Sequence, residues 1–230
     1  MDRALPLEAP IPDYLRAYAS ASEEHGAELP AMLMASEAWQ QQRFAVLAST
    51  APLADRVVAD VGSGRADLLA WLYTHDIPYA RYVGVEAIPT FDEFARSRAA
   101  RERLPDASFE LGDFVAEPEL FDRLVAEHDV DVFILCGSLN TLSEADALAA
   151  LDRAFAALAD KPGAVLAFNF LAGGGDWRRP ETDLPRRDSS RWIAWALERT
   201  PLVTFCQAYL AAHDATIVMT RPQTPTPRPA

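Results

Sequence analysis

Short apolar and β-branched runs alternate with amphipathic stretches from residue 56 onward, and this alternation restricts the fold more than any other feature. It predicts parallel strands joined by right-handed helical crossovers, and hence an open, doubly wound sheet. Two runs, 130–137 and 164–171, are almost wholly apolar, as expected of strands covered on both faces. Strands are expected at 56–61, 82–86, 108–113, 130–137 and 164–171, and helices at 65–74, 90–103, 116–128 and 143–160.

The end of the chain departs from this alternation. A helical stretch at 188–199, capped by Asp188 or Ser189, is followed by strand-like runs at 202–210 and 216–221 with only AAHDA between them. Two strands joined by so short a connection form an antiparallel hairpin. The sequence therefore predicts an α/β fold with a doubly wound, mostly parallel seven-stranded sheet that ends in an antiparallel hairpin.

The N-terminal region contains two helical patterns within 11–50, the second over 30–50. Ser36, Gln40 and Arg43 recur at helical spacing, so they share one polar-leaning face of that second helix. After residue 221 the tail alternates Pro with polar residues, a composition that has no core to join. The expected divisions are an N-terminal helical cap at 1–50, an α/β domain at 51–221 and a mobile Pro-rich tail at 222–230.

The charge balance makes nucleic acid a poor partner. The 230 residues contain 21 Lys and Arg against 34 Asp and Glu, a net charge of -13, which repels phosphate backbones. No apolar segment approaches the ~20 residues that span a bilayer, and no signal-peptide pattern begins the sequence, so we expect a cytoplasmic protein without a membrane partner. Cys136 and Cys206 lie in apolar runs without His or Cys at ligand spacing, which predicts buried free thiols and no metal site.

A glycine-rich loop at 58–67 follows the first predicted strand. A strand that runs into Gly62, Ser63 and Gly64 and then into a helix lets backbone approach a nucleoside ligand closely. Glu86 ends the next predicted strand, where an acidic side chain can accept hydrogen bonds from both ribose hydroxyls. The alternative is a purely structural turn.

The charges beside this loop bear on which nucleoside binds. Asp67 stands where the third glycine of the dinucleotide-binding pattern packs near a pyrophosphate, and a carboxylate there costs on the order of 1–4 kcal/mol. Asp60 adds a second anion near the same turn. A ligand with a cationic sulfonium or ammonium and no phosphate removes the conflict, and S-adenosyl-L-methionine is such a ligand. Asp67 is equally explained as an acid that favours the N-terminus of its helix.

At these residues the chain resembles the class I S-adenosylmethionine-dependent methyltransferases, over roughly 22–221. Asp60-x-Gly62-x-Gly64 is similar to their first motif, Gly112-Asp113-Phe114 to the segment whose acid takes the adenine amino group, and Cys136-Gly137-Ser138 to the lining of the reaction centre. EHG, QQRF, GSLN, FNFL and YLxxHDxT resemble a bacterial branch of small-molecule enzymes with few assigned substrates. Ala66 departs from the family pattern, which has a third glycine there.

The resemblance implies a Rossmann-like methyltransferase fold, S-adenosyl-L-methionine as cofactor and a set of cofactor-binding residues. Two of them have structural alternatives: Asp113 as the N-cap of a helix that begins near Glu117, and Arg43 as a salt-bridge partner instead of a ligand of the methionyl carboxylate. The expected cofactor-binding residues are Arg43, Asp60, Gly62, Ser63, Gly64, Asp67, Glu86, Ala87, Asp113, Phe114 and Gly137.

Candidate catalytic residues follow the strands at the edge where open α/β sheets bind ligands. His213, in the terminal hairpin turn with Asp214, has the chemistry to accept a proton and is expected beside the acceptor instead of the adenosine. The alternative is that His213 and Asp214 only satisfy the backbone groups of their own turn. Asn140 has an amide that can hold an acceptor, although capping of the helix near Ser143 is an equal alternative. Asn169, Trp177 in a glycine-rich loop, and His25 are weaker candidates.

The function expected from these features is transfer of a methyl group from S-adenosylmethionine to an O or N atom of a small molecule by in-line displacement. Two alternatives stay open. One is an NAD(P)-dependent oxidoreductase on a similar sheet, and the other is a non-catalytic S-adenosylmethionine-binding protein. The oligomeric state is not determined by the sequence.

Overall fold

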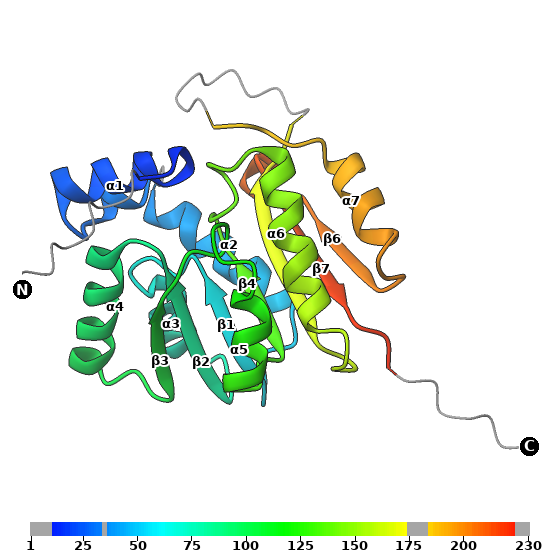
Figure 1. The fold of residues 1–230 in the computed structure, drawn as a ribbon, viewed down its shortest axis with the longest axis horizontal. Helices are drawn as coiled ribbons and strands as arrows, with labels where there is room; N and C mark the ends of the chain where they lie inside the picture. The colour runs from blue at the N-terminus through cyan, green and yellow to red at the C-terminus, as the bar shows by residue number, and fades with distance from the viewer. Residues whose placement is uncertain (1–10, 34–35, 174–183, 224–230) are drawn as a thin grey trace, which may run out of the picture.

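The structure, a computed structural model, describes residues 11–33, 36–173 and 184–223, and it contains a seven-stranded sheet in the order β3-β2-β1-β4-β5-β7-β6 (Figure 1). The strands are β1 (Val57–Val61), β2 (Arg81–Glu86), β3 (Ala107–Leu111), β4 (Val132–Leu135), β5 (Val165–Leu171), β6 (Val203–Cys206) and β7 (Asp214–Thr220). The helices are α1 (Asp13–His25), α2 (Glu37–Thr50), α3 (Asp67–Thr74), α4 (Pro89–Glu102), α5 (Leu120–His128), α6 (Glu144–Ala157) and α7 (Ser189–Leu197), with short 3-10 helices η1 (Leu29–Met32) and η2 (Leu210–Ala212).

The strand directions confirm the fold class expected from the sequence. Strands β1 to β5 pair in parallel, and β7 runs antiparallel to both β5 and β6. All residues of β1, β4 and β5 are buried, whereas the edge strands β3 and β6 are partly exposed. The sheet is thus doubly wound and mostly parallel, and it ends in an antiparallel pair.

The strand predicted over 202–210 is shorter than expected, because it ends at Cys206. Tyr209 and η2 follow, and the Tyr209 hydroxyl pairs with the Thr216 hydroxyl at 2.7 Å. Gln207 donates from its side chain to the Ala212 carbonyl. These contacts fold 207–213 back over the start of β7, so the connection is a compact loop instead of a tight turn.

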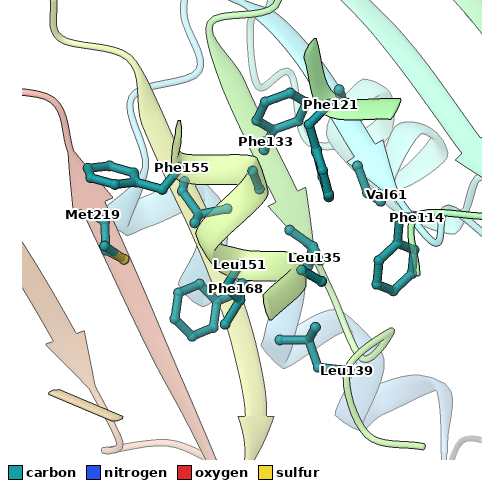
Figure 2. Close-up of a cluster of buried hydrophobic side chains, with 14 of the residues drawn as sticks. Val61, Phe114, Phe121, Phe133, Leu135, Leu139, Leu151, Phe155, Phe168 and Met219 are labelled. Atoms are coloured by element: carbon teal, nitrogen blue, oxygen red, sulfur yellow. The ribbon is translucent and has the colours of Figure 1, made fainter. Parts of the chain in front are cut away.

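The helices cover both faces of the sheet, with α2, α3 and α4 on one face and α5, α6 and α7 on the other (Figure 1). Figure 2 shows part of the second layer, where Phe121, Leu151 and Phe155 pack against Phe133 and Phe168 of the sheet. Val58 points to the face of the sheet that α2 and α3 cover. Asp60, two residues further along β1, points to the same face because side chains alternate along a strand. A carboxyl group therefore enters this layer where β1 ends.

The N-terminal helices differ from the expectation at one point, because the helix predicted over 30–50 is two elements. Pro30 lies in the first turn of η1, and Leu33 after it has a left-handed φ of 52°. Ser36 then caps α2 by accepting a hydrogen bond from the Trp39 amide at 3.3 Å, so it precedes the helix instead of lying on its face. Helix α2 buries Phe44 against the sheet layer.

The expected burial of the two cysteines is corrected, and two other expectations concern residues that the structure does not describe. Cys136 and Cys206 are free, as expected, but both are only partly buried. Trp177 and most of the tail, 224–230, lie outside the described residues. In the part of the chain that the structure describes, no helix combines the length and the apolar character needed to cross a membrane.

Candidate ligand-binding site

A cavity of about 560 Å³ opens at the carboxyl ends of β1, β2, β3 and β4, beneath α1, η1 and α2. Open parallel sheets bind ligands at this edge. All the residues expected in the site except Gly64 line this cavity: Arg43, Asp60, Gly62, Ser63, Asp67, Glu86, Ala87, Asp113, Phe114, Gly137, Asn140 and His213.

The glycine loop is held close to the end of β4. Gly62 has a φ of +79°, and a Cβ atom built there would lie 2.4 Å from Cβ of Ser138. The amides of Gly62 and Ser63 both donate to the Val85 carbonyl, at 2.8 and 3.0 Å. Gly64 is covered by the side chain of Met32, whose methyl carbon lies 2.2 Å from the position of an added Cβ. Gly62 therefore faces the cavity, whereas Gly64 supports the loop beneath η1.

Glu86 fastens the loop to the end of β2. Its carboxylate accepts backbone hydrogen bonds from Gly64 at 2.7 Å, Ala87 at 2.8 Å and Ile88 at 2.9 Å. Burial raises the pKa of Glu86, and these hydrogen bonds oppose the rise because they favour the ionised form. The side chain thus shapes the cavity floor as well as lining it.

Asp60 is the most strongly perturbed acid in the cavity. It is 3% exposed, and its Oδ2 accepts a hydrogen bond from the Tyr82 hydroxyl at 2.5 Å. Burial raises the pKa of Asp60 to about 7, the Tyr82 hydrogen bond opposes the rise, and the negative charges of Glu86 and Asp67 add to it. Asp60 therefore changes its charge near neutral pH.

Asp67 is compensated by neighbouring arginines. It begins α3, and its carboxylate pairs with Arg98 at 2.5 Å and with Arg65 at 3.6 Å, while Gln40 donates to it at 3.3 Å. Because the two arginines offset its negative charge, Asp67 repels a nearby phosphate less strongly than expected from the sequence. Ala66, which precedes it, adopts a left-handed φ of 57°, the conformation that the glycine of the longer motif would favour.

Asp113 closes a turn after β3 instead of capping a helix near Glu117, because α5 begins only at Leu120, and it also contacts α1. Its Oδ1 accepts hydrogen bonds from the amides of Val115 at 2.9 Å and Ala116 at 3.1 Å, while its own amide donates to Glu117 at 2.7 Å. Its Oδ2 accepts from the Tyr14 hydroxyl at 2.7 Å. Asp113 therefore ties α1 to the end of β3.

The end of β4 is positioned by Asn169 of β5, which is 1% exposed. Its Oδ1 accepts from the Gly137 amide at 2.7 Å, and its amide group donates to the Cys136 sulfur at 3.6 Å. Burial raises the pKa of Cys136 to about 12, so the thiol stays protonated at neutral pH. Asn140 lines the cavity but does not cap α6, because Ser143 provides that cap.

His213 belongs to a buried charged group that joins α2 to β7. Its Nδ1 donates to the Asp214 carboxylate at 2.5 Å, and Asp214 also pairs with Arg43 at 2.5 Å. Burial alone would raise the pKa of Asp214, but the hydrogen bond from His213 and the charge of Arg43 outweigh it and lower that pKa. The Trp39 ring packs edge-on against the imidazole, with 4.8 Å between centroids. These contacts hold the imidazole at the cavity wall.

Several lining residues were not expected from the sequence. They lie on the N-terminal elements and on α4, whose helical patterns do not show which side meets the sheet edge. His25 is not among the lining residues, and its Nε2 lies 3.7 Å from Oε1 of the adjacent Glu24. The unexpected aromatic and apolar lining residues on these elements are Tyr14, Leu15, Tyr18, Met32, Leu33, Trp39, Phe44 and Phe91, and further apolar lining residues are Leu68, Ile88, Leu142, Leu171 and Leu184.

No protein-family model matches the chain, and no curated protein matches it. Solved structures do match. An O-methyltransferase family protein from Burkholderia thailandensis gives a TM-score of 0.64 at 16% identity, over 92% of this chain and 67% of that one. Phosphoethanolamine N-methyltransferase 1 from Haemonchus contortus, in complex with phosphoethanolamine and S-adenosylhomocysteine, gives a TM-score of 0.62 at 14% identity. The match covers 98% of this chain and 53% of that one. The [4+2]-cyclase SpnF gives a TM-score of 0.58 at 15% identity, over 80% of this chain and 81% of that one.

These similarities establish a shared fold. The chain has the Rossmann-like fold of the class I S-adenosylmethionine-dependent methyltransferases, as expected from the sequence. It spans 67% and 53% of the two methyltransferase chains, so both contain substantial parts that have no counterpart here. Because one protein with this fold is a cyclase, the reaction has to be argued from the site.

Proposed function

We propose that this protein is an S-adenosylmethionine-dependent methyltransferase that acts on an oxygen or nitrogen atom of a small molecule. One observation carries the proposal: Gly62, Asp60 and Glu86, which come from successive strand ends, line a single cavity beneath a helical cover. The solved structures with the same fold include methyltransferases, which supports it further.

The cavity fits S-adenosylmethionine in size and in charge. Its volume of about 560 Å³ lies within the ~300–1,000 Å³ typical of small-ligand sites. Gly62 lets the loop pack against the end of β4, because any side chain there would meet Ser138, and it lines the cavity. Asp60, Glu86 and Asp113 give the lining an acidic character that favours a cation.

The cofactor, when bound, supplies an electrophilic methyl group on a sulfonium, so the chain mainly has to position the acceptor and exclude water. Tyr18 and Met32 close the cavity from the N-terminal side, and Trp39 lines it beside His213. Asn140 offers both an amide donor and an amide acceptor to orient the acceptor. These side chains provide alignment, which supplies much of the rate enhancement in such displacements.

His213 is the residue we propose as the general base. Asp214 holds its Nδ1–H, so Nε2 is the ring nitrogen that would take the proton of an acceptor hydroxyl or amine. The buried, ionised Asp214 would then stabilise the imidazolium that forms, as a carboxylate does beside a catalytic histidine.

The two alternatives are tested by binding and by turnover. Isothermal titration should show micromolar binding of S-adenosylmethionine or S-adenosylhomocysteine and none of NADH. Tight binding of NADH with no response to either sulfur compound would replace the proposal with an oxidoreductase. Binding of both sulfur compounds, with no S-adenosylhomocysteine released from any panel of hydroxyl and amine acceptors, would favour a non-catalytic binding protein.

A further inference from the structure

The three acids on the cavity floor are stabilised in different ways. Asp67 pairs with arginines, and Glu86 accepts three backbone hydrogen bonds. Asp60 accepts a hydrogen bond from the neutral hydroxyl of Tyr82, and among the described residues no basic side chain forms an ion pair with it. A buried carboxylate without a counter-ion is costly, so Asp60 is the acid whose charge depends most on what enters the cavity.

The position of Asp60 is fixed by the sheet. It pairs with Gly84, whose missing side chain leaves space that Ser63 and Phe109 fill. Tyr82, two residues earlier on β2, has the same parity and reaches Asp60 with its hydroxyl. The Tyr82 ring is fully buried beside Phe109, so this hydroxyl is held in place.

We propose, on the basis of the proposed function, that the cationic end of the ligand displaces a proton from Asp60, and that Tyr82 determines the pH at which this exchange occurs. The carboxyl O–H bond breaks, the proton passes to solvent, and the carboxylate remains as counter-ion of the α-ammonium group of the ligand. Asp60 then acts as a specificity residue that selects a cationic ligand over a neutral nucleoside.

The surrounding charges favour this exchange. Glu86 and Asp67 oppose the ionisation of Asp60 in the empty cavity, and burial opposes it further, so that its pKa stands at about 7. An entering cation reverses this balance, because an opposite charge at short distance favours the ionised form. The other titratable groups near Asp60 or its acidic neighbours are Tyr82 on β2, Cys136 after β4, Tyr18 on α1, Arg43 on α2, Arg65 before α3, and Asp92 and Arg98 on α4.

The experiment counts protons during binding. Titration with S-adenosylhomocysteine near pH 6, in two buffers of different ionisation enthalpy, gives the protons released per ligand; the α-amino group of the ligand is already protonated at that pH. We expect about 0.9 proton at pH 6 and about 0.1 at pH 8, with affinity about tenfold weaker at the lower pH. The same titration with 5′-methylthioadenosine, which has the nucleoside but no cation, should release none.

Two variants make the result specific to this pair. Asp60→Asn should abolish the proton release, whereas Tyr82→Phe should move the fall in affinity to higher pH, because it removes the hydrogen bond that favours the carboxylate. Circular dichroism checks whether each variant folds. If Asp60→Asn does not fold, the pH dependence of binding by Tyr82→Phe still tests the proposal. Binding without proton release, equal release with 5′-methylthioadenosine, or release that persists in folded Asp60→Asn would overturn this inference alone. Absence of binding by both S-adenosylmethionine and S-adenosylhomocysteine would overturn the proposed function with it.

Discussion

The guanidinium of Arg43 and the carboxylate of Asp214 form a buried two-point contact, with Nε–Oδ2 at 2.5 Å and Nη2–Oδ1 at 3.2 Å. The pair joins α2 to the first residue of β7, and both side chains are almost fully buried, at 6% and 1% exposure. Breaking such a pair on one side removes a counter-charge from a buried group, although Asp214 keeps its contact with His213.

Arg43→Met and Asp214→Asn should therefore each lower the free energy of unfolding by about 3–5 kcal/mol. The double variant should lose less than the sum, because either single change already removes the interaction between the two charges. Urea denaturation of the four proteins measures this coupling. Arg16→Met is the matched control, since its ion pair with Asp13 is exposed, and it should have no measurable effect. Additive losses would show that Arg43 and Asp214 stabilise the protein independently.

The close contact of the glycine loop with the end of β4 gives a second prediction. Gly62→Ala combines a left-handed backbone with a Cβ clash against Ser138, so it should cost about 2–5 kcal/mol. Adding Ser138→Gly should recover about 1–3 kcal/mol, the steric part of that loss. Gly26→Ala is the control, because Gly26 has a φ of +60° but no atom within 4 Å of an added Cβ. If Gly62→Ala costs no more than Gly26→Ala, the loop is looser than described.

Glu86→Ala should affect both the fold and ligand affinity. It leaves three backbone amides without their acceptor, so the melting temperature should fall by several degrees. Affinity for S-adenosylhomocysteine should fall at least tenfold, since a hydrogen bond to a charged group contributes about 1.5–3 kcal/mol. A thermal melt beside a binding isotherm separates the two effects. Unchanged affinity in the folded fraction would limit Glu86 to supporting the loop.

His213→Ala tests the proposed base. Because the imidazole lies by α2 and β7, away from the ends of β2 and β3, we expect S-adenosylmethionine affinity to stay within about twofold while turnover falls about 100-fold. Asp214→Asn should also reduce turnover, through loss of the imidazole's orientation. A pH profile of turnover that keeps its acidic limb in His213→Ala would assign the proton transfer to another group.

The raised pKa of Asp60 predicts how stability depends on pH without ligand. The folded state keeps the proton between the ordinary value of 3.8 and about 7, so this contribution to stability is complete below 3.8 and is lost as pH rises through 7. The Asp60→Asn variant has no carboxyl group at this position, so its stability does not change with pH for this reason. The melting temperature of Asp60→Asn relative to the natural protein should therefore increase from pH 5 to pH 8. A difference that does not change over that range would mean that Asp60 is ionised throughout.

Much of the fold could be predicted because strands buried on both faces leave a continuous apolar signal, as in β4 and β5. The boundaries were harder where polar groups redirect the chain. Helix α5 begins at Leu120 instead of 116 because Asp113 and Glu117 close a turn before it. The left-handed residues 210–212, which redirect the chain after β6, are Leu and Ala, so no glycine marked that turn.

The site could be predicted only in part, for a similar reason. Asp60 and Glu86 lie at the carboxyl ends of β1 and β2, and the topology brings these strand ends together whatever their side chains are. Arg43 lay on the expected polar face, but its partner Asp214 is 171 residues away, and spacing along a helix does not identify such a contact. Tyr14 and Met32 belong to elements whose docking depends on tertiary contacts.

The position of α1 also has a practical consequence for labelling this protein. The helix begins at Asp13, and the next residue, Tyr14, already lines the cavity. A label attached at the exposed Asp13 would therefore lie next to the lining of the cavity. Strand β7 starts beside the cavity at Asp214 and runs away from it to Thr220, so a label attached at the exposed Pro222 would lie at the opposite end of the sheet. A reporter of ligand binding belongs at the first of these positions, and a reference label that should not respond to ligand belongs at the second.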